Sequence, residues 1–305
     1  MMTDHFLTDY FHLMIFATVS TLHSAPQPAL VSKGRVYPLS FADMHEVIRF
    51  SADIIQLPET SLAMDEVRFH APLRPTTLRD AYAFEQHVRT ASQNRGRDVP
   101  QEWYKFPAFY YTNPHTIFGP DEVIPYPRYT SALDFELEIA VIIGKGGRDI
   151  KPEDAPAHIF GYTIFNDWSA RDVQREELRI GLGPAKGKDF ASSLGPVIVT
   201  SEALADRTVN RPGVYDLTMT AKVNGVEMSR ANLKDIFWAF GEIIARASDM
   251  CELQAGDVIG SGTVGTGCLL ELTKGQGPWL NAGDVVELEI EEIGILKNTI
   301  GEKSK

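Results

Sequence analysis

The sequence predicts an α+β fold that is mainly β, with a small domain at 14–70 and a larger domain at 71–305. Many short apolar runs, such as "DLTMTAKVNG" and "DVVELEI", are separated by Gly, Asn and Asp, as in strands joined by turns. The segment "FHAPLRPTT" has two prolines and no periodicity, so we expect a linker there. A chain of 305 residues is long enough for both domains.

The small domain begins with the short apolar run 14–19, which we expect to be its first strand. "PALVSKGRVYPL" then contains two short β-leaning runs joined by Lys33 and Gly34, and "FADMHEVIRFSADI" has the pattern of a helix. Residues 1–13 precede the first strand, and we expect this extension to be poorly ordered.

Two helices are expected in the larger domain, one over 233–247 and one that begins near Ser169. Ser169 followed by Asp172 resembles a capping box, in which each side chain satisfies a backbone N–H group of the other residue. "IGKGGRDI" and "AKGKDF" are rich in Gly and Lys but lack the spacing of a P-loop, so we interpret both as turns.

The composition narrows the possible partners. A formal charge of -12 argues against nucleic acid or an anionic membrane as a partner, and an anionic substrate would need a local cationic lining. The N-terminal apolar run is too short for a membrane span and lacks the basic residues of a signal peptide. Cys251 and Cys268 are the only cysteines, so we expect a reducing cytoplasm and interpret Cys268 as a small buried thiol.

One strand-like run contains an unusually high proportion of acidic residues. In "DFELEIA", period-two alternation directs Asp134, Glu136 and Glu138 to one face, where three like charges require a cation. A polar face in water is the simpler explanation for an isolated E-x-E, and Glu287 and Glu289 repeat the tripeptide with no other chemistry beside it. The first copy differs because "NDWSARDVQ" follows it and "DAYAFEQH" precedes it.

These motifs resemble those of the fumarylacetoacetate hydrolase family. "LDFELEIAVIIGKGGRDI", "GYTIFNDWSARDVQ", "LGPAKGKDFASSLGP" and "GDVIGSGTVGTGCLLEL" occur in family order, and the resemblance covers roughly residues 70 to 295. It implies a mixed β-roll catalytic domain, the small N-terminal domain and a homodimer.

The resemblance also implies a metal site beside cationic side chains. An all-oxygen ligand set suits a hard cation, so we expect Mg²⁺, with Mn²⁺ or Ca²⁺ as alternatives. Such a set would keep surplus negative charge, for which the family motif supplies cations. The expected ligands are Asp80, Glu136, Glu138 and Asp167, and the expected catalytic neighbours are Arg171, Gln174 and Lys188.

His87 is the expected general base. It matches the catalytic histidine of the family in its spacing from Asp80, and the two would share a face if this segment were helical. Glu271 matches the carboxylate that orients that histidine, and such an acceptor raises the basicity of the other ring nitrogen. His70, His115 and His158 are interpreted as ordinary polar residues.

The resemblance implies substrate contacts by Tyr82, Arg95, Tyr110 and Thr263, with Tyr111 and Arg97 as alternatives to two of them. Two departures put the substrate in doubt. The family's second substrate-side tyrosine is replaced by Leu178, and the N-terminal domain is shorter than that of the eukaryotic enzyme.

We expect a metal-dependent hydrolase of a carbon–carbon bond in a 1,3-diketo acid, such as fumarylacetoacetate or an acylpyruvate. His87 would activate water, and Arg171→Ala would slow turnover with little loss of folding stability. The alternatives are a 2-oxoacid decarboxylase, an isomerase or a sugar-acid dehydratase of the same superfamily. A non-catalytic calcium-binding module would explain the carboxylates but not the histidine beside them.

Overall fold

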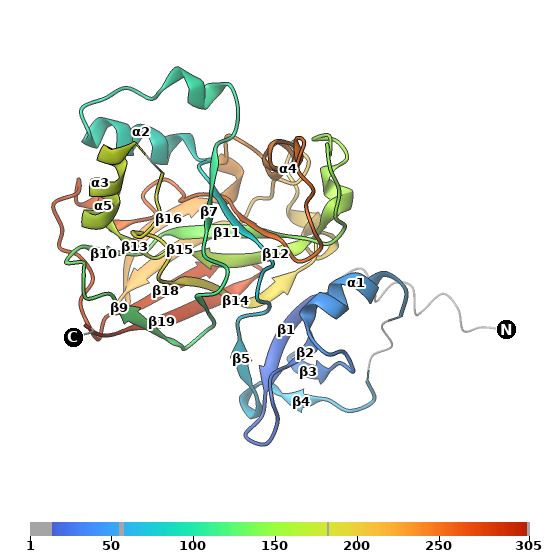
Figure 1. Ribbon diagram of the computed structural model, residues 1–305. Coiled ribbons are helices and arrows are strands. Elements are labelled where there is room, and N and C mark those ends of the chain that lie inside the picture. The colour runs from blue at the N-terminus through green and yellow to red at the C-terminus, as the bar shows by residue number, and fades with distance from the viewer. Residues whose placement is uncertain (1–13, 55–57, 182, 304–305) are drawn as a thin grey trace.

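The computed structural model describes residues 14–54, 58–181 and 183–303, so the expected extension at 1–13 lies outside the described residues. The fold is mainly β, as predicted. Its largest sheet has 12 strands, ordered β4-β3-β2-β1-β14-β12-β11-β17-β6-β7, with β5 and β8 paired to β1 and β14 (Figure 1). A second sheet has the order β16-β15-β18-β19-β9, and β10 pairs with β13.

The strands are β1 Ile15–Ser20, β2 Gln27–Ser32, β3 Arg35–Pro38, β4 Leu62–Ala63, β5 Arg68–His70, β6 Leu78–Ala81, β7 Phe109–Thr112, β8 Ile117–Phe118, β9 Val123–Tyr126, β10 Leu133–Asp134, β11 Leu137–Ile143, β12 Ile159–Asn166, β13 Ser169–Ala170, β14 Ser192–Val199, β15 Thr218–Val223, β16 Val226–Asn232, β17 Val258–Gly260, β18 Val285–Ile290 and β19 Gly294–Lys303. The α-helices are α1 Met44–Ile54, α2 Glu85–Asn94, α3 Arg171–Ile180, α4 Phe240–Ser248 and α5 Leu269–Leu272. Short 3-10 turns are η2 Met64–Glu66, η3 Gln101–Tyr104, η4 Ala155–His158, η5 Glu202–Arg207 and η6 Leu233–Asp235.

The N-terminal elements follow the sequence pattern. β2 and β3 form a hairpin whose two turn residues, Lys33 and Gly34, have φ of 50° and 71°. Positive φ at both positions is the geometry of a two-residue hairpin turn with the twist of its strands. β1 pairs with β2 on one edge and, through Ile15 and Phe16, with β14 on the other. The N-terminal strands are therefore continuous with the largest sheet.

β11 is a buried strand that contains the acidic residue Glu138. It lies between β12 and β17, and every residue from Leu137 to Ile143 is buried. A strand that is covered on both faces has no solvent face for a charge. The explanation of Glu136 and Glu138 as an exposed polar face is therefore wrong.

One of the two expected helices is interrupted, and the other begins close to Ser169 as predicted but lacks the predicted cap. Residues 233–247 form η6 and α4 rather than one helix, because Phe237 and Trp238 donate their backbone N–H groups to the carbonyl oxygen of Ala83 at 2.9 and 3.3 Å. α3 begins at Arg171 without the expected capping box, since Asp172 accepts hydrogen bonds from Thr130 and Ser131 instead.

Candidate active site

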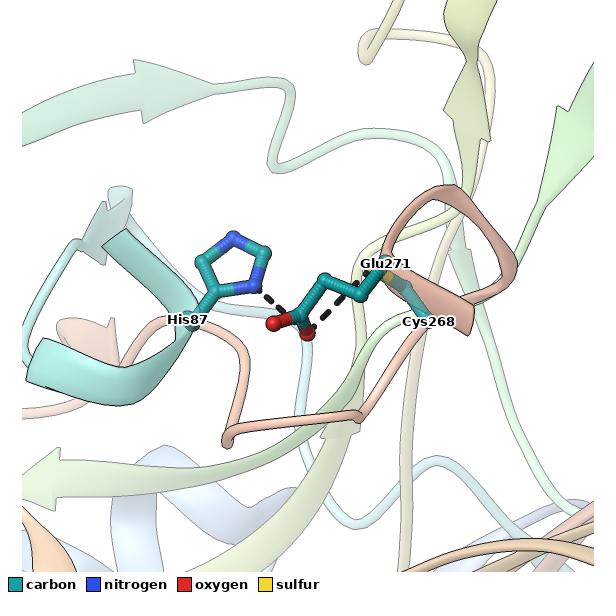
Figure 2. Close-up of side chains that lie close together, drawn as sticks. All are labelled: His87, Cys268 and Glu271. Atoms are coloured by element: carbon teal, nitrogen blue, oxygen red, sulfur yellow. Dashed lines mark hydrogen bonds and ion pairs between the residues drawn. The ribbon is translucent and has the colours of Figure 1, made fainter. Parts of the chain in front are cut away.

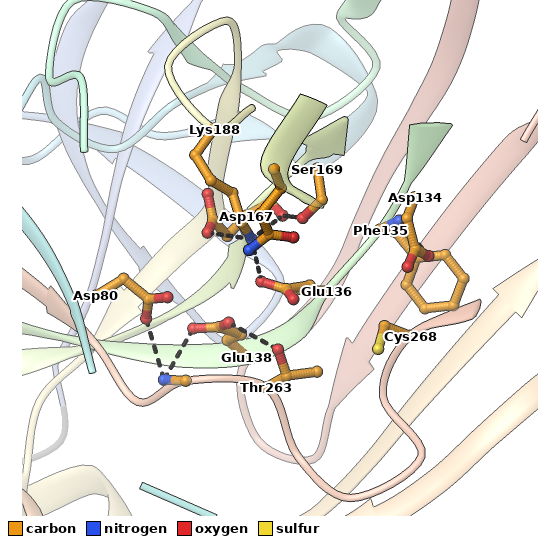
Figure 3. A network of polar contacts seen from close by, with 12 residues as sticks. Asp80, Asp134, Phe135, Glu136, Glu138, Asp167, Ser169, Lys188, Thr263 and Cys268 are labelled. Carbon is orange, nitrogen blue, oxygen red and sulfur yellow. Dashed lines mark hydrogen bonds and ion pairs between the residues drawn. The ribbon is translucent and has the colours of Figure 1, made fainter. Parts of the chain in front are cut away.

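The expected metal ligands converge from three strands (Figure 3). Asp80 is in β6, Glu136 precedes β11, and Asp167 follows β12. All three are buried, and one carboxylate oxygen from each lies within 4.8 Å of those of the others. We call these residues the acidic triad. Asp80 lies in β6 and His87 in α2, so no single helix joins them and the condition for a shared helix face is not met.

Glu138 lies beside the acidic triad and shares a donor with it. The backbone N–H of Gly262 donates to Asp80 at 3.1 Å and to Glu138 at 3.0 Å (Figure 3). Gly262 has a φ of +80°, and a Cβ there would lie 2.6 Å from the carbonyl oxygen of Ala81. Thr263 donates its hydroxyl to Glu138 at 3.3 Å. The glycine-rich turn therefore holds two of the expected ligands in place, and a contact between Thr263 and substrate stays a prediction.

Two buried cations offset these carboxylates. Lys188 donates to Glu136 at 2.5 Å and to Asp167 at 2.7 Å. Arg171 donates from Nη2 to Glu136 at 2.8 Å and from Nη1 to the side-chain oxygen of Gln174 at 3.1 Å. Burial favours the neutral form of Glu136, but Lys188 and Arg171 outweigh it and lower its pKa.

Asp134 is a structural anchor, and the expectation that it shares one strand with Glu138 was wrong, because it lies in β10, which pairs with β13. Its carboxylate accepts from Nε of Arg171 at 2.8 Å and from the backbone N–H groups of Leu269 and Leu270 at 2.8 and 3.0 Å. The last two bonds fix the start of α5, which carries Glu271. Asp134 thus joins the cationic side of the site to α5.

The donor set fits a divalent cation. Burial raises the pKa of Asp80 and of Glu138 well above the ordinary range, and neighbouring carboxylates raise both further. Burial raises the pKa of Asp167 to about 6, although Lys188 opposes this shift. Oδ1 of Asp167 is buried without a hydrogen-bond partner among the described residues. A divalent ion together with Lys188 would relieve this repulsion, and hard cations prefer such oxygen ligands.

The expected base and its carboxylate meet, although 184 residues separate them in the chain (Figure 2). Nδ1 of His87 lies 2.8 Å from Oε2 of Glu271, close enough for an ion pair when the ring is protonated but off the direction of a hydrogen bond. Both side chains are buried, and the His87 charge lowers the pKa of Glu136. The pair therefore lies next to the acidic triad.

Of the residues expected to contact substrate, the tyrosines Tyr82 and Tyr110 contact residues of the site, whereas the arginines are exposed. Tyr110 donates its hydroxyl to Asp167, whereas Tyr111 is 57% exposed, so the site contains the first of these alternatives. The edge of the Tyr82 ring packs on His87 with centroids 5.3 Å apart, and burial raises the pKa of Tyr82 to about 12. Arg95 is exposed at the end of α2, where its charge acts on Tyr82. Arg97 is also exposed.

The second E-L-E copy confirms the contrast expected from its surroundings. Glu287 and Glu289 alternate with buried residues of β18. Nζ of Lys297 lies 4.0 Å from Oε1 of Glu287, and Nζ of Lys222 lies 3.6 Å from Oε2 of Glu289; both lysines are half-exposed. The same tripeptide therefore forms ordinary surface ion pairs where no second acidic element faces it.

Comparison with known proteins identifies the family. Residues 76–301 match the family model described as fumarylacetoacetate (FAA) hydrolase C-terminal. The chain belongs to this family. The oxaloacetate tautomerase YisK of Bacillus subtilis is 32% identical over 245 residues, which are 78% of this chain and 75% of that protein. No helix in the described ranges is long and apolar enough to cross a membrane.

Solved structures of the fumarylacetoacetate hydrolase family confirm the expected fold type. A fumarylacetoacetate hydrolase from Exiguobacterium antarcticum has a TM-score of 0.76 and 28% identity, covering 95% of this chain and 100% of that one. A probable 2-hydroxyhepta-2,4-diene-1,7-dioate isomerase from Mycobacterium abscessus has a TM-score of 0.75 and 26% identity, covering 96% and 99%. Relatives with different reactions therefore share this architecture.

Proposed function

We propose that the protein is a divalent-metal-dependent enzyme that hydrolyses a carbon–carbon bond in a small anionic 1,3-diketo acid. The observation that carries this proposal is the 2.8 Å approach of Glu271 to His87 beside the acidic triad. A histidine backed by a carboxylate is suited to take a proton from water, because the carboxylate stabilises the imidazolium that forms. By the resemblance, the enzyme would act as a homodimer.

The ion is expected at Asp80, Glu136, Glu138 and Asp167, with Mg²⁺ preferred over Mn²⁺ or Ca²⁺. When bound, it would supply electrophilic polarisation of the two substrate carbonyl oxygens. His87 would take a proton from water, and the hydroxide would form a C–O bond at one carbonyl carbon. The adjacent C–C bond would then break, and its electron pair would remain on the leaving enolate. His87 would return the proton to the enolate carbon that the broken bond had joined to the attacked carbonyl carbon.

The cations would act mainly on the carboxylates. Arg171 and Lys188 already donate to Glu136 in the described structure, so their first role would be to keep that ligand ionised. Gln174 accepts from Arg171 through its side-chain oxygen, which leaves its amide N–H groups to donate to a substrate oxygen.

Keto–enol isomerisation of a 2-oxo dicarboxylic acid is the second candidate. It is supported by the relatives named oxaloacetate tautomerase and by the structural neighbour described as an isomerase. In this reaction His87 would remove a proton from the carbon beside the carbonyl and return it to another atom of the substrate. No water is consumed and no C–C bond breaks, so the products distinguish the candidates.

The deciding experiment uses purified protein with Mg²⁺ in ¹⁸O-labelled water and a panel of acylpyruvates, fumarylacetoacetate and oxaloacetate. Hydrolysis gives two shorter acids, one of which gains labelled oxygen from the attacking water. Isomerisation gives no cleavage but accelerates the keto–enol equilibration of oxaloacetate, and carbon dioxide release would favour a decarboxylase. We expect His87→Gln to lower diketo acid hydrolysis by about 10²- to 10⁴-fold. Undiminished hydrolysis by this variant, or by wild type in excess chelator, would contradict the proposal.

A further inference from the structure

A second group of side chains that could hold a metal ion is separate from the acidic triad, and Figure 2 shows its three members. His87 comes from α2, Cys268 precedes α5, and Glu271 lies within α5. All three are buried, and one ligand atom from each lies within 4.8 Å of those of the others. We propose that these residues form a separate site for Zn²⁺ or a similar thiophilic ion, whose occupancy switches off His87.

The distances are close to those of a tetrahedral zinc site. Oε2 of Glu271 lies 2.8 Å from Nδ1 of His87 and 3.8 Å from Sγ of Cys268. With ordinary zinc bond lengths, tetrahedral ligand atoms are about 3.3–3.7 Å apart. Small side-chain rotations would therefore produce a site with three protein ligands. Its fourth position would remain open to water, as in catalytic rather than structural zinc sites.

Unsatisfied atoms provide an independent observation. Oε1 of Glu271 is buried and has no hydrogen-bond partner among the described residues, and Nδ1 of His87, although 2.8 Å from Oε2 of Glu271, makes no hydrogen bond there. Both residues are 5% exposed, so water does not readily compensate for the missing bonds. Buried polar atoms of this kind call for a physical explanation, and a bound ion is one of the usual ones. Coordination would satisfy both side chains at once.

The ligand types would separate the two sites by metal preference. The acidic triad offers only oxygen, whereas Cys268 and His87 add the sulfur and nitrogen that zinc prefers over magnesium. A bound thiolate, a carboxylate and a neutral imidazole would balance the charge of Zn²⁺. Burial raises the pKa of Cys268, so the free thiol is protonated, and zinc must displace that proton. Magnesium has too little affinity for sulfur to do so.

The functional consequence rests on the proposed role of His87. Coordination would use the Nδ1 lone pair, so any proton on Nδ1 would be released to solvent, and Glu271 would bind the ion instead of orienting the ring. The ring would then be held as a metal ligand, with a positive ion beside it that opposes protonation. Zinc would therefore act as an inhibitor in the presence of saturating Mg²⁺.

The direct test needs no substrate, so its outcome is separable from that of the proposed function. Wild-type protein is titrated with Co²⁺ in saturating Mg²⁺ and a phosphine reductant, and thiolate-to-cobalt absorption is recorded in the near ultraviolet. We expect one cobalt per chain to give this band, and Zn²⁺ to abolish it. Cys268→Ser and Cys268→Ala should lose the band, while Cys251→Ser, the matched control, should keep it. No band in wild type, or a band that follows Cys251, would overturn the site.

Inhibition is then measured as the rate with zinc divided by the rate without zinc for each variant. We expect Zn²⁺ to lower wild-type turnover by about 10²-fold, which is the lower range of general base catalysis. The Cys268→Ser variant should resist the same zinc concentration, and a chelator followed by Mg²⁺ should restore the wild type. Equal inhibition of both proteins would assign the effect of zinc to the acidic triad and overturn the proposed switch, even if cobalt bound to Cys268.

Discussion

Arg171 offers the sharpest test of how the site is built, because it holds two buried carboxylates at once. Nε lies 2.8 Å from Asp134 and Nη2 lies 2.8 Å from Glu136, and all three side chains are almost fully shielded from solvent. The expectation from sequence, that Arg171→Ala would barely affect stability, does not survive this geometry. Truncation would leave both carboxylates without their shared cation in a low-dielectric interior.

The magnitude follows from the cost of an uncompensated buried charge. Removing one partner of a buried ion pair costs about 3–5 kcal/mol. We expect the lower part of this range for Arg171→Ala, because Lys188 still contacts Glu136 and two backbone N–H groups of α5 still contact Asp134. Such a loss is a large fraction of the roughly 5–15 kcal/mol that stabilises a typical domain.

The assay is urea unfolding of metal-free protein, with Lys222→Ala as the matched control. Lys222 pairs with Glu289 of the second E-L-E copy at 3.6 Å, but both side chains are half-exposed, so its removal should cost no more than about 1 kcal/mol. The lowered pKa of Glu136 adds stability above its unfolded pKa of about 4.3, which is lost as the pH falls through the folded pKa. The difference in free energy of unfolding between wild type and Arg171→Ala should therefore become smaller at acidic pH. Equal effects of the two substitutions would refute the reasoning.

Three further predictions concern the metal ligands. Gly262→Ala should weaken Mg²⁺ binding in calorimetry, because its methyl group would lie 2.6 Å from a backbone oxygen, whereas Gly225→Ala, with a similar φ of +79° and no atom within 4 Å, should not. Tyr110→Phe removes a hydrogen-bond donor to Asp167 and should lower Mg²⁺ affinity by about 10- to 100-fold. Tyr111→Phe, at an exposed position, is the control and should leave the affinity unchanged; an unchanged affinity in Tyr110→Phe would exclude this support role. Since the pKa of Asp167 is raised to about 6, protons should compete with Mg²⁺ below that pH, and a pH-independent affinity would contradict the shift.

The parts of the site that could be predicted from sequence were those with a local signal. Alternation predicted that Glu136 and Glu138 share a face, and the fully buried β11 explains why they need compensation. Arg171 and Gln174 are three residues apart, which places them on one face of a helix, and their side chains meet at 3.1 Å on α3. The second E-L-E copy shows that the tripeptide alone would not have sufficed.

Other features depend on contacts far apart in the chain. The break between η6 and α4 arises from hydrogen bonds to Ala83, which no helical periodicity near 233–247 could reveal. The His87–Glu271 approach was expected only through the family resemblance, because no local pattern joins α2 to α5. The bond from Tyr110 to Asp167 likewise had no sequence signal, because the family resemblance implied a substrate contact for Tyr110 and not a contact with Asp167.

The pairing of β1 with β14 affects how the chain is made. Ile15 and Phe16 leave the ribosome early, whereas their partners Val199 and Ile198 follow about 180 residues later, which is roughly 10 to 35 seconds at ordinary elongation rates. β2 pairs with one edge of β1 soon after synthesis. On the other edge, Ile15 and Phe16 stay unpaired until β14 has been synthesised. During that interval a nascent apolar strand displays unpaired amide and carbonyl groups to any neighbouring chain. Slower elongation would lengthen the exposure, so the yield of native protein should depend on translation speed and on chaperones that shield the emerging chain.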